Sequence, residues 1–225
     1  ADAQAVALAW MVTATTSPGS SPPNPGLPLR AGCAPDALPP KPMDPLAKQW
    51  FVTLDALNAL LWAQWRAGWF VADASPLLAS MDLPVDSGMT IAMRAPQPPF
   101  LSDCPGPGLR LHVPELAFDA DLLIGTGTVT VRFEAPVTVA LEAGALRLTF
   151  GNADPVHTDA TTDSPATDLE RIMEKRARDK AIPALLDLWR KAGLLAVPLP
   201  GTGWTQVQAV AGGDDYRDLW IPFDV

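Results

Sequence analysis

The sequence predicts an α+β fold in which two helices pack against one face of an antiparallel sheet. Residues 53–65 and 164–192 carry apolar side chains at the three- and four-residue spacing of amphipathic helices. Between these segments, residues 109–150 alternate apolar and polar side chains, which is typical of antiparallel strands covered on one face. We therefore expect the apolar face of the sheet to pack against the apolar stripes of the helices.

The N-terminal part is rich in proline and is expected to lie outside the packed domain. Of the 25 prolines in the 225-residue chain, ten lie between residues 17 and 45. Because proline lacks a backbone N–H, this stretch predicts an extended loop or linker that follows a short strand at residues 5–12. We expect residues 1–49 to form the strand and linker, and residues 50–225 to form the folded domain.

The first helix is the clearest element of the chain. Thr53 is a favourable N-cap, and Gly68 is expected to end the helix. Residues three and four positions apart form an apolar stripe, which is flanked by Asn58 and Trp62: Leu54, Leu57, Leu61 and Trp65. The other side of the helix is also largely apolar, so we expect burial over much of its circumference.

The alternating segments predict a β-meander. Pro136 and Gly144 fall between alternating stretches and predict short connections there. The Gly-Thr-Gly-Thr sequence at residues 125–128 resembles part of a phosphate-binding loop, but its place inside an alternating run favours a bulge or bend. Residues 152–163 are polar and are expected to form a loop.

The second helix is expected to begin at Ser164 as its N-cap and to end at Ala192. At about 1.5 Å per residue, such a helix would be close to 40 Å long. Pro183 should kink or split it, because proline removes a hydrogen bond and clashes with the preceding turn. A final strand or pair of strands is predicted over residues 204–210 and 216–225.

Charge and composition exclude several function classes. The chain has 16 Lys and Arg against 25 Asp and Glu, and the resulting net charge of −9 opposes binding to nucleic acid or to an anionic membrane surface. The sequence contains no nucleophile-elbow, Walker or dinucleotide-binding motif, and His112 is expected on the polar, solvent-facing side of a strand. Residues 154–163 fit no calcium-loop spacing, so a solvated loop is favoured over a metal site. We therefore expect a non-enzymatic protein without a cofactor or metal.

Residues 57–68 carry a pattern that is known from a protein family. They read L-N-x-x-L-W-x-x-W-x-x-G, which resembles the helix-opening motif of the bactericidal/permeability-increasing protein (BPI) and lipid-transfer family, within the tubular lipid-binding (TULIP) superfamily. The order downstream is similar to the C-terminal module of that family, with a meander, a proline-containing helix at residues 182–186 and a closing strand at residues 219–225. The resemblance covers residues 50–225.

This resemblance implies an α+β fold with long helices wrapped by a strongly curved antiparallel sheet, a half-barrel that encloses a tubular groove for lipid acyl chains. Inward-facing apolar residues would line the groove: Leu57, Leu61, Trp65, Val131, Val139, Leu148, Leu185 and Trp189. Endotoxin-binding members carry a cationic tip, whereas this chain is acidic and its densest basic cluster, residues 175–178, lies among acids. We therefore expect a neutral or zwitterionic lipid.

Two functions from different classes remain open at this point. The chain either binds and transfers lipid, or is a structural or protein-interaction module of the same fold with a filled core. An enzyme with carboxylate or metal chemistry at residues 152–163 is a third hypothesis. Expected partners are a lipid, a membrane contacted transiently, and a preceding module of the same superfamily or a second copy of the chain.

Cys33 and Cys104 are far apart in the sequence and form no C-x-x-C motif. They either form one disulfide or stay as two free thiols. A disulfide requires an oxidising compartment, so this alternative places the protein among secreted or periplasmic (cell-envelope) proteins.

Overall fold

The computed structural model describes the chain in segments: residues 48–52, 54–75, 89–102, 109–122, 125–142, 144–154, 156–163, 168–192, 196–198, 208–211 and 217–223. The larger of two antiparallel sheets has the strand order β2-β3-β5-β6-β7-β9, with β4 paired to β5 and β8 paired to β6. Its strands are β2 (Ala72–Asp73), β3 (Thr90–Arg94), β4 (Phe100–Ser102), β5 (Leu109–Leu122), β6 (Gly125–Glu142), β7 (Ala145–Phe150), β8 (Val156–Thr162) and β9 (Ala196–Pro198). The smaller sheet has the order β1-β11-β10, formed by β1 (Lys48–Val52), β11 (Arg217–Phe223) and β10 (Gln208–Ala211).

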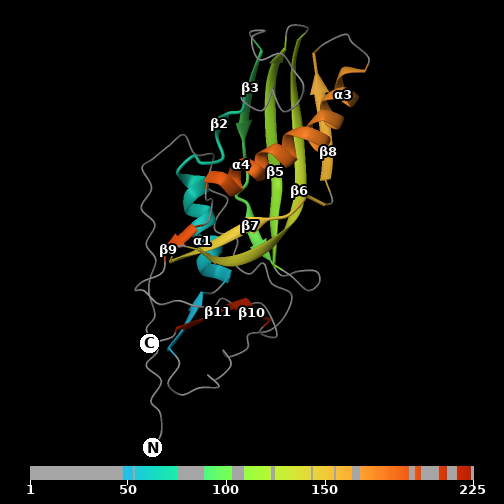
Figure 1. Ribbon diagram of the computed structural model, residues 1–225. Coiled ribbons are helices and arrows are strands. Elements are labelled where there is room, and N and C mark those ends of the chain that lie inside the picture. The colour runs from blue at the N-terminus through green and yellow to red at the C-terminus, as the bar shows by residue number, and fades with distance from the viewer. Residues whose placement is uncertain are drawn as a thin grey trace, which may run out of the picture.

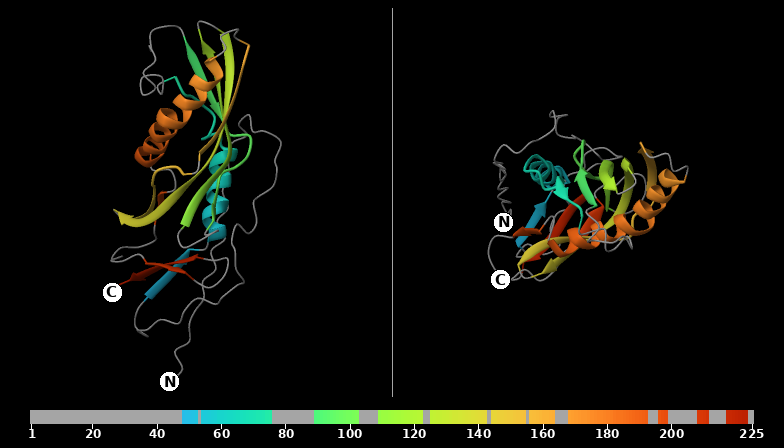
Figure 2. Two further views of the ribbon diagram at one scale, coloured as in Figure 1. Left: turned by 90° about the vertical axis from the view of Figure 1, so that its right-hand side faces the viewer. Right: turned by 90° about the horizontal axis from the view of Figure 1, so that it is seen from above.

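The larger sheet curls into a half-barrel, which Figures 1 and 2 show from three directions. The 18-residue strand β6 pairs with β5 on one side, and on its other side first with β8 and then with β7. A register shift between Val113 and Leu116 adds one residue to β5, and such a bulge bends a strand and increases its twist. The prediction of a curved antiparallel sheet in an α+β protein is confirmed.

Pro136 does not end a strand, so the connection predicted there is wrong. β6 continues through it, and its inward side chains keep the same alternation on both sides of the proline. Pro136 lies where β6 has left β8 and has not yet joined β7, so no strand on that side needs the missing N–H. Its carbonyl accepts instead from the Gly151 N–H at 2.8 Å. Gly144 does form a turn, between β6 and β7, with a φ of 75°.

The polar segment at residues 152–163 is not a loop throughout, and this prediction is also wrong. Most of it forms β8, which pairs antiparallel with residues 127–133 of β6. Branched side chains such as Val156 and Thr158 favour an extended backbone. Because Ala160 is the one residue of β8 that is fully buried, the strand carries no clear apolar alternation.

The first helix, α1 (Leu54–Arg66), forms close to its predicted position. Its end is a Schellman motif, in which the Gly68 N–H donates to Trp65 O at 3.0 Å and the Trp69 N–H donates to Gln64 O at 3.1 Å. Gly68 has a φ of 84°, a conformation that favours glycine, so the predicted helix end is confirmed. The predicted cap, Thr53, lies outside the described residues.

The second helical segment is interrupted, so the prediction of long helices is wrong. It consists of α3 (Leu169–Arg176), a π-helical turn η1 (Ala177–Ala181) and α4 (Ile182–Ala192), of 8, 5 and 11 residues, while α1 has 13 residues. Figure 1 shows these three pieces crossing the sheet diagonally. The predicted cap Ser164 lies outside the part of the chain that the structure describes.

Pro183 provides the physical reason for the interruption. In a regular α-helix its ring would collide with the carbonyl four residues before it, and it has no N–H to donate. Just before the proline, the Ile182 N–H donates to the Ala177 carbonyl five residues back, which is a π-helical bond. The extra residue in this turn changes the position of the preceding carbonyls relative to the ring. The predicted kink therefore takes the form of a widened turn ahead of the proline.

The closing strands are confirmed as an antiparallel hairpin of β10 and β11, and β1 pairs with the other side of β11. Besides the two helix caps, four predicted features lie outside the described residues: the strand at residues 5–12, the proline-rich segment, Cys33 and Cys104.

Gly127 allows α3 to approach the sheet closely. A Cβ at this position would lie 2.8 Å from Met173 Cε and 3.0 Å from the Thr161 carbonyl oxygen. Gly127→Ala is therefore expected to lower the free energy of unfolding by about 1–2 kcal/mol through overpacking, as measured by urea unfolding. In a Met173→Ala background the same change should cost clearly less. An equal cost in both backgrounds would contradict the close contact.

Candidate functional site

The predicted groove-lining residues come from four elements and belong to one hydrophobic cluster. They are Leu57, Leu61 and Trp65 on α1, Val131 and Val139 on β6, Leu148 on β7, and Leu185 and Trp189 on α4. Seven of them are at most 5% exposed, and Val139 is half-buried at the margin of the cluster. The fold thus brings all eight predicted residues together between the sheet and the helices.

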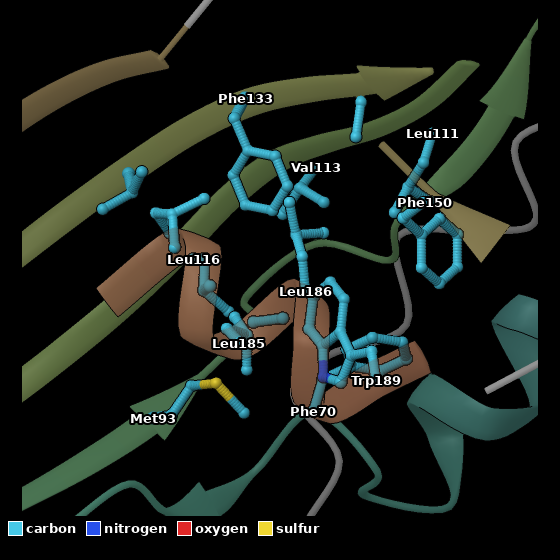
Figure 3. Close-up of a cluster of buried hydrophobic side chains, with 14 of the residues drawn as sticks. Phe70, Met93, Leu111, Val113, Leu116, Phe133, Phe150, Leu185, Leu186 and Trp189 are labelled. Carbon is cyan, nitrogen blue, oxygen red and sulfur yellow. The ribbon is translucent and has the colours of Figure 1, made fainter. Parts of the chain in front are cut away.

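Trp189 of α4 packs against both the sheet and the segment after α1. Its ring meets Phe70 edge-on with the ring centroids 5.3 Å apart, and stacks against Phe133 at 6.5 Å. Figure 3 shows Phe133 and Val113 of the sheet pointing toward Leu186 and Trp189 of the helix. Aromatic contacts of this kind add to the hydrophobic free energy of burial and hold α4 in place.

Side chains fill the space between α4 and the sheet. Leu61, Val131 and Leu185 are at most 1% exposed, so there is no room for a water molecule beside them. Close packing of this kind is typical of protein cores. An acyl chain could occupy this space only if some of these side chains moved.

Asn58 fastens α1 to the sheet, a role that the sequence prediction missed. Its side chain is 1% exposed; Nδ2 donates to Leu101 O at 3.0 Å, and Oδ1 accepts from the Leu101 N–H at 2.6 Å. About two turns further along the helix, Trp65 Nε1 donates to Ala95 O at 2.7 Å. The sequence did contain a signal for this role, because Asn58 lies beside an apolar stripe and a buried polar side chain needs hydrogen-bond partners.

The other face of the sheet is polar and carries cross-strand ion pairs. Arg110 Nε lies 2.9 Å from Glu134 Oε2, and His112 Nδ1 lies 3.3 Å from Glu134 Oε1. His112 also stacks on Phe100, with the ring centroids 4.9 Å apart. The histidine therefore lies on the polar face as predicted, but at 16% exposure it is more buried than expected.

Asp119 joins three neighbouring strands on this polar face. Arg94 Nε donates to its Oδ2 at 2.8 Å, and Thr128 Oγ1 donates to its Oδ1 at 2.8 Å. The hydrogen bond from Arg94 lowers the pKa of Asp119; desolvation opposes this effect, and the bond from Thr128 adds to it. The ionised carboxylate therefore stabilises the folded state.

Asp119→Asn is expected to lower the free energy of unfolding at neutral pH by less than about 1 kcal/mol, because the ion pair is exposed. The pKa of Asp119 is lower in the folded state than its unfolded value of about 4, so its stabilisation is present above that pH and is lost as the pH falls. The difference between wild type and variant should shrink in acid, as measured by urea unfolding at a series of pH values. Asp121→Asn on the same strand is the control, and a difference independent of pH would count against this role.

A separate hollow of about 390 Å³ lies between the segment before β8 and the junction of η1 with α4. Its lining consists of Asn152, Ala153, Asp154, Val156, Arg178, Ile182 and Pro183. The backbone of Asp154 is fixed at two points, because its N–H donates to Glu134 O at 2.8 Å and its carbonyl accepts from Arg110 Nη2 at 2.6 Å. One wall of the hollow is therefore held in position by the sheet.

Metal ligation receives no support from the described residues, where no three His, Cys, Asp or Glu side chains gather in a way that could hold an ion. Asp163, at the end of the polar segment, instead accepts from the Thr126 N–H at 2.7 Å and from Thr126 Oγ1 at 2.9 Å. Each helix in the described segments is too short or too polar to cross a bilayer.

These features define an α+β protein with an antiparallel half-barrel whose inner face is covered by helices. The chain matches no known protein-family model and no curated protein. The likeness to the BPI and lipid-transfer family therefore stays a prediction from the sequence.

Proposed function

We propose that the protein is a non-enzymatic module that binds and carries lipid, with acyl chains held between the curled sheet and α4. The observation that supports this most is the convergence of the eight predicted lining residues, from segments far apart in the sequence, on the inner side of the half-barrel. The sequence resemblance and the acidic net charge of −9 favour a neutral or zwitterionic lipid.

Lipid binding at this place requires α4 to move, because side chains fill the space beneath it. A chain of about fifteen methylenes gains about 12 kcal/mol on burial, at about 0.8 kcal/mol each. Exposing the buried Leu185, Leu186 and Trp189 costs about 2–3 kcal/mol for each side chain. Burial of the methylenes therefore exceeds the cost of exposing these three side chains alone, and the difference has to offset the free energy of association as well.

Lipid extraction tests this proposal directly. Organic extraction of the purified protein followed by mass spectrometry is expected to yield co-purified lipid, and the fluorescent fatty acid cis-parinaric acid is expected to bind. Leu185→Ala should change the affinity for this probe, whereas Leu188→Ala on the same helix should not, because Leu188 is 52% exposed. A folded protein that carries no lipid and does not bind cis-parinaric acid would refute the proposal.

A protein-interaction module with a filled core is the second candidate function. The near-zero exposure of Leu61, Val131 and Leu185 favours it, because such packing needs no ligand. It predicts a folded, lipid-free protein that associates with another protein or with a second copy. Light scattering coupled to size-exclusion chromatography measures the self-association.

We also propose a secreted or periplasmic location, which depends on a Cys33–Cys104 disulfide. Alkylation of the unreduced, denatured protein followed by mass spectrometry tests the bond. No alkylation is expected, and two alkylated thiols would rule the disulfide out. The lipid-carrier proposal also includes transient contact with a membrane and a preceding module of the same superfamily.

A further inference from the structure

We propose that the hollow beside η1 binds a small zwitterion with an apolar body, at a site separate from the space proposed for acyl chains. Its volume of about 390 Å³ lies in the range of small-molecule pockets. The walls present a guanidinium group, a carboxylate and apolar side chains, and these groups match the three parts of such a ligand.

Arg178 and Asp154 contribute the two charges, one from η1 and the other from the segment that precedes β8. Arg178 Nε donates to Asp179 Oδ1 at 3.2 Å. Among the described residues, the terminal N–H groups of Arg178 have no partner, and neither has the side chain of Asp154. The guanidinium can therefore bind a carboxylate or phosphate through its terminal groups, and Asp154 can bind an ammonium group.

A zwitterion satisfies both charges at once. Arg178 already has Asp179 as a partner at Nε, and both Arg178 and Asp154 are exposed, so neither charge requires a ligand. A ligand with one charge would gain one exposed ion pair, with Asp154 or with the terminal N–H groups of Arg178, whereas a zwitterion would gain both. A simple anion is also disfavoured by the net charge of −9. Opposite charges on the two walls thus favour a ligand that carries both signs.

The rest of the lining suits an apolar group. Val156, Pro183 and the fully buried Ile182 are the larger apolar residues of the lining. Because the backbone of Asp154 is already held by Glu134 and Arg110, this backbone needs little further ordering when a ligand binds. Two sources share this chemistry, namely a free α-amino acid with an apolar side chain and the zwitterionic headgroup of a phospholipid.

Titrations followed by the amide NMR signals of residues 152–156 and 178–183 test the site with soluble probes. L-leucine represents the free amino acid, and glycerophosphocholine represents the headgroup without acyl chains. L-leucinamide lacks the carboxylate and N-acetyl-L-leucine lacks the ammonium group. Each analogue is expected to bind at least about fivefold more weakly than L-leucine, which corresponds to one exposed ion pair of about 1 kcal/mol.

Matched variants test which residue binds each charged group of the ligand. Arg178→Gln and Asp154→Asn should each weaken binding of the zwitterion at least about fivefold. Arg171→Gln and Asp159→Asn are the controls, because both residues are exposed and lie outside the hollow. All four changes affect exposed side chains, so circular dichroism should show unchanged folding.

The outcomes separate the alternatives. A response to glycerophosphocholine and not to L-leucine supports the zwitterion site and assigns it to a lipid headgroup. Analogues that bind as tightly as L-leucine, variants that bind as well as wild type, or the absence of a response to both zwitterions would overturn the proposal. None of the probes has a long acyl chain, so these results are independent of lipid binding beneath α4.

Discussion

Replacing Asn58 with leucine is expected to lower the free energy of unfolding by about 2–6 kcal/mol. The side chain is 1% exposed and bonds to both the N–H and the carbonyl of Leu101. Leucine has a similar size and no polar atom, so both backbone groups would be buried without their partner, at about 1–3 kcal/mol each. Urea unfolding followed by circular dichroism measures the change.

Two further variants define the origin of this effect. Asn58→Asp keeps an acceptor for the Leu101 N–H but removes the donor and buries a carboxyl group, so it should also destabilise the fold. Asn152→Leu places the same apolar side chain on an exposed segment and should change the stability by less than about 0.5 kcal/mol. Equal losses at Asn58 and Asn152 would show that the bonds to Leu101 are unimportant.

Trp189→Ala should have an effect of similar size, about 3–5 kcal/mol, because it removes a large buried ring and leaves a cavity. The ring contacts Phe70 and Phe133, so its loss loosens α4 from both the sheet and the segment after α1. Trp189→Phe keeps an aromatic ring and should recover part of the stability. Urea unfolding followed by circular dichroism is again the measurement.

Trp69 provides the matched control, because its side chain is 53% exposed. Trp69→Ala removes the same group from the surface and should cost less than about 1 kcal/mol. If the two tryptophans proved equally important, the cluster beneath α4 would not be a main source of stability.

The alternation of side chains was sufficient to predict the sheet but not the course of its strands. From Val129 to Leu141 the apolar residues of β6 keep one phase through Pro136, yet the proline was interpreted as a connection between two strands. Whether a proline can lie within a strand depends on whether a neighbouring strand needs the missing N–H as a donor. This depends on the pairing of strands in the folded protein. The polar strand β8 was missed for a related reason, since Ala160 is its one fully buried residue.

In the helices, too, local sequence signals predicted some features, whereas others depend on the folded structure. The start and end of α1 follow from its stripe and from Gly68, which are local signals. The presence of Pro183 predicted a distortion, but the widened turn at Ala177–Ala181 depends on how the helix accommodates the ring.

The candidate sites differ in how far the sequence predicts them. Helical and strand periodicity identified side chains that share the inner face, including Leu61, Val131 and Leu185. Periodicity carries no information on whether such side chains leave a space between them, which depends on packing in three dimensions. The hollow with Asp154 and Arg178 was not predicted, because its walls come from segments that are adjacent only in the fold.

Three side chains form hydrogen bonds with backbone groups at the margins of the larger sheet. Glu174 Oε1 accepts from the Ala160 N–H on β8 at 3.2 Å, Ser75 Oγ accepts from the Ile91 N–H on β3 at 3.2 Å, and Arg190 Nη2 donates to Phe150 O on β7 at 3.1 Å. Free backbone groups at a sheet margin are a template for strands from other molecules and for fibril growth. An incoming strand would have to displace these side chains before it could pair with the sheet. The three hydrogen bonds therefore disfavour aggregation through these positions.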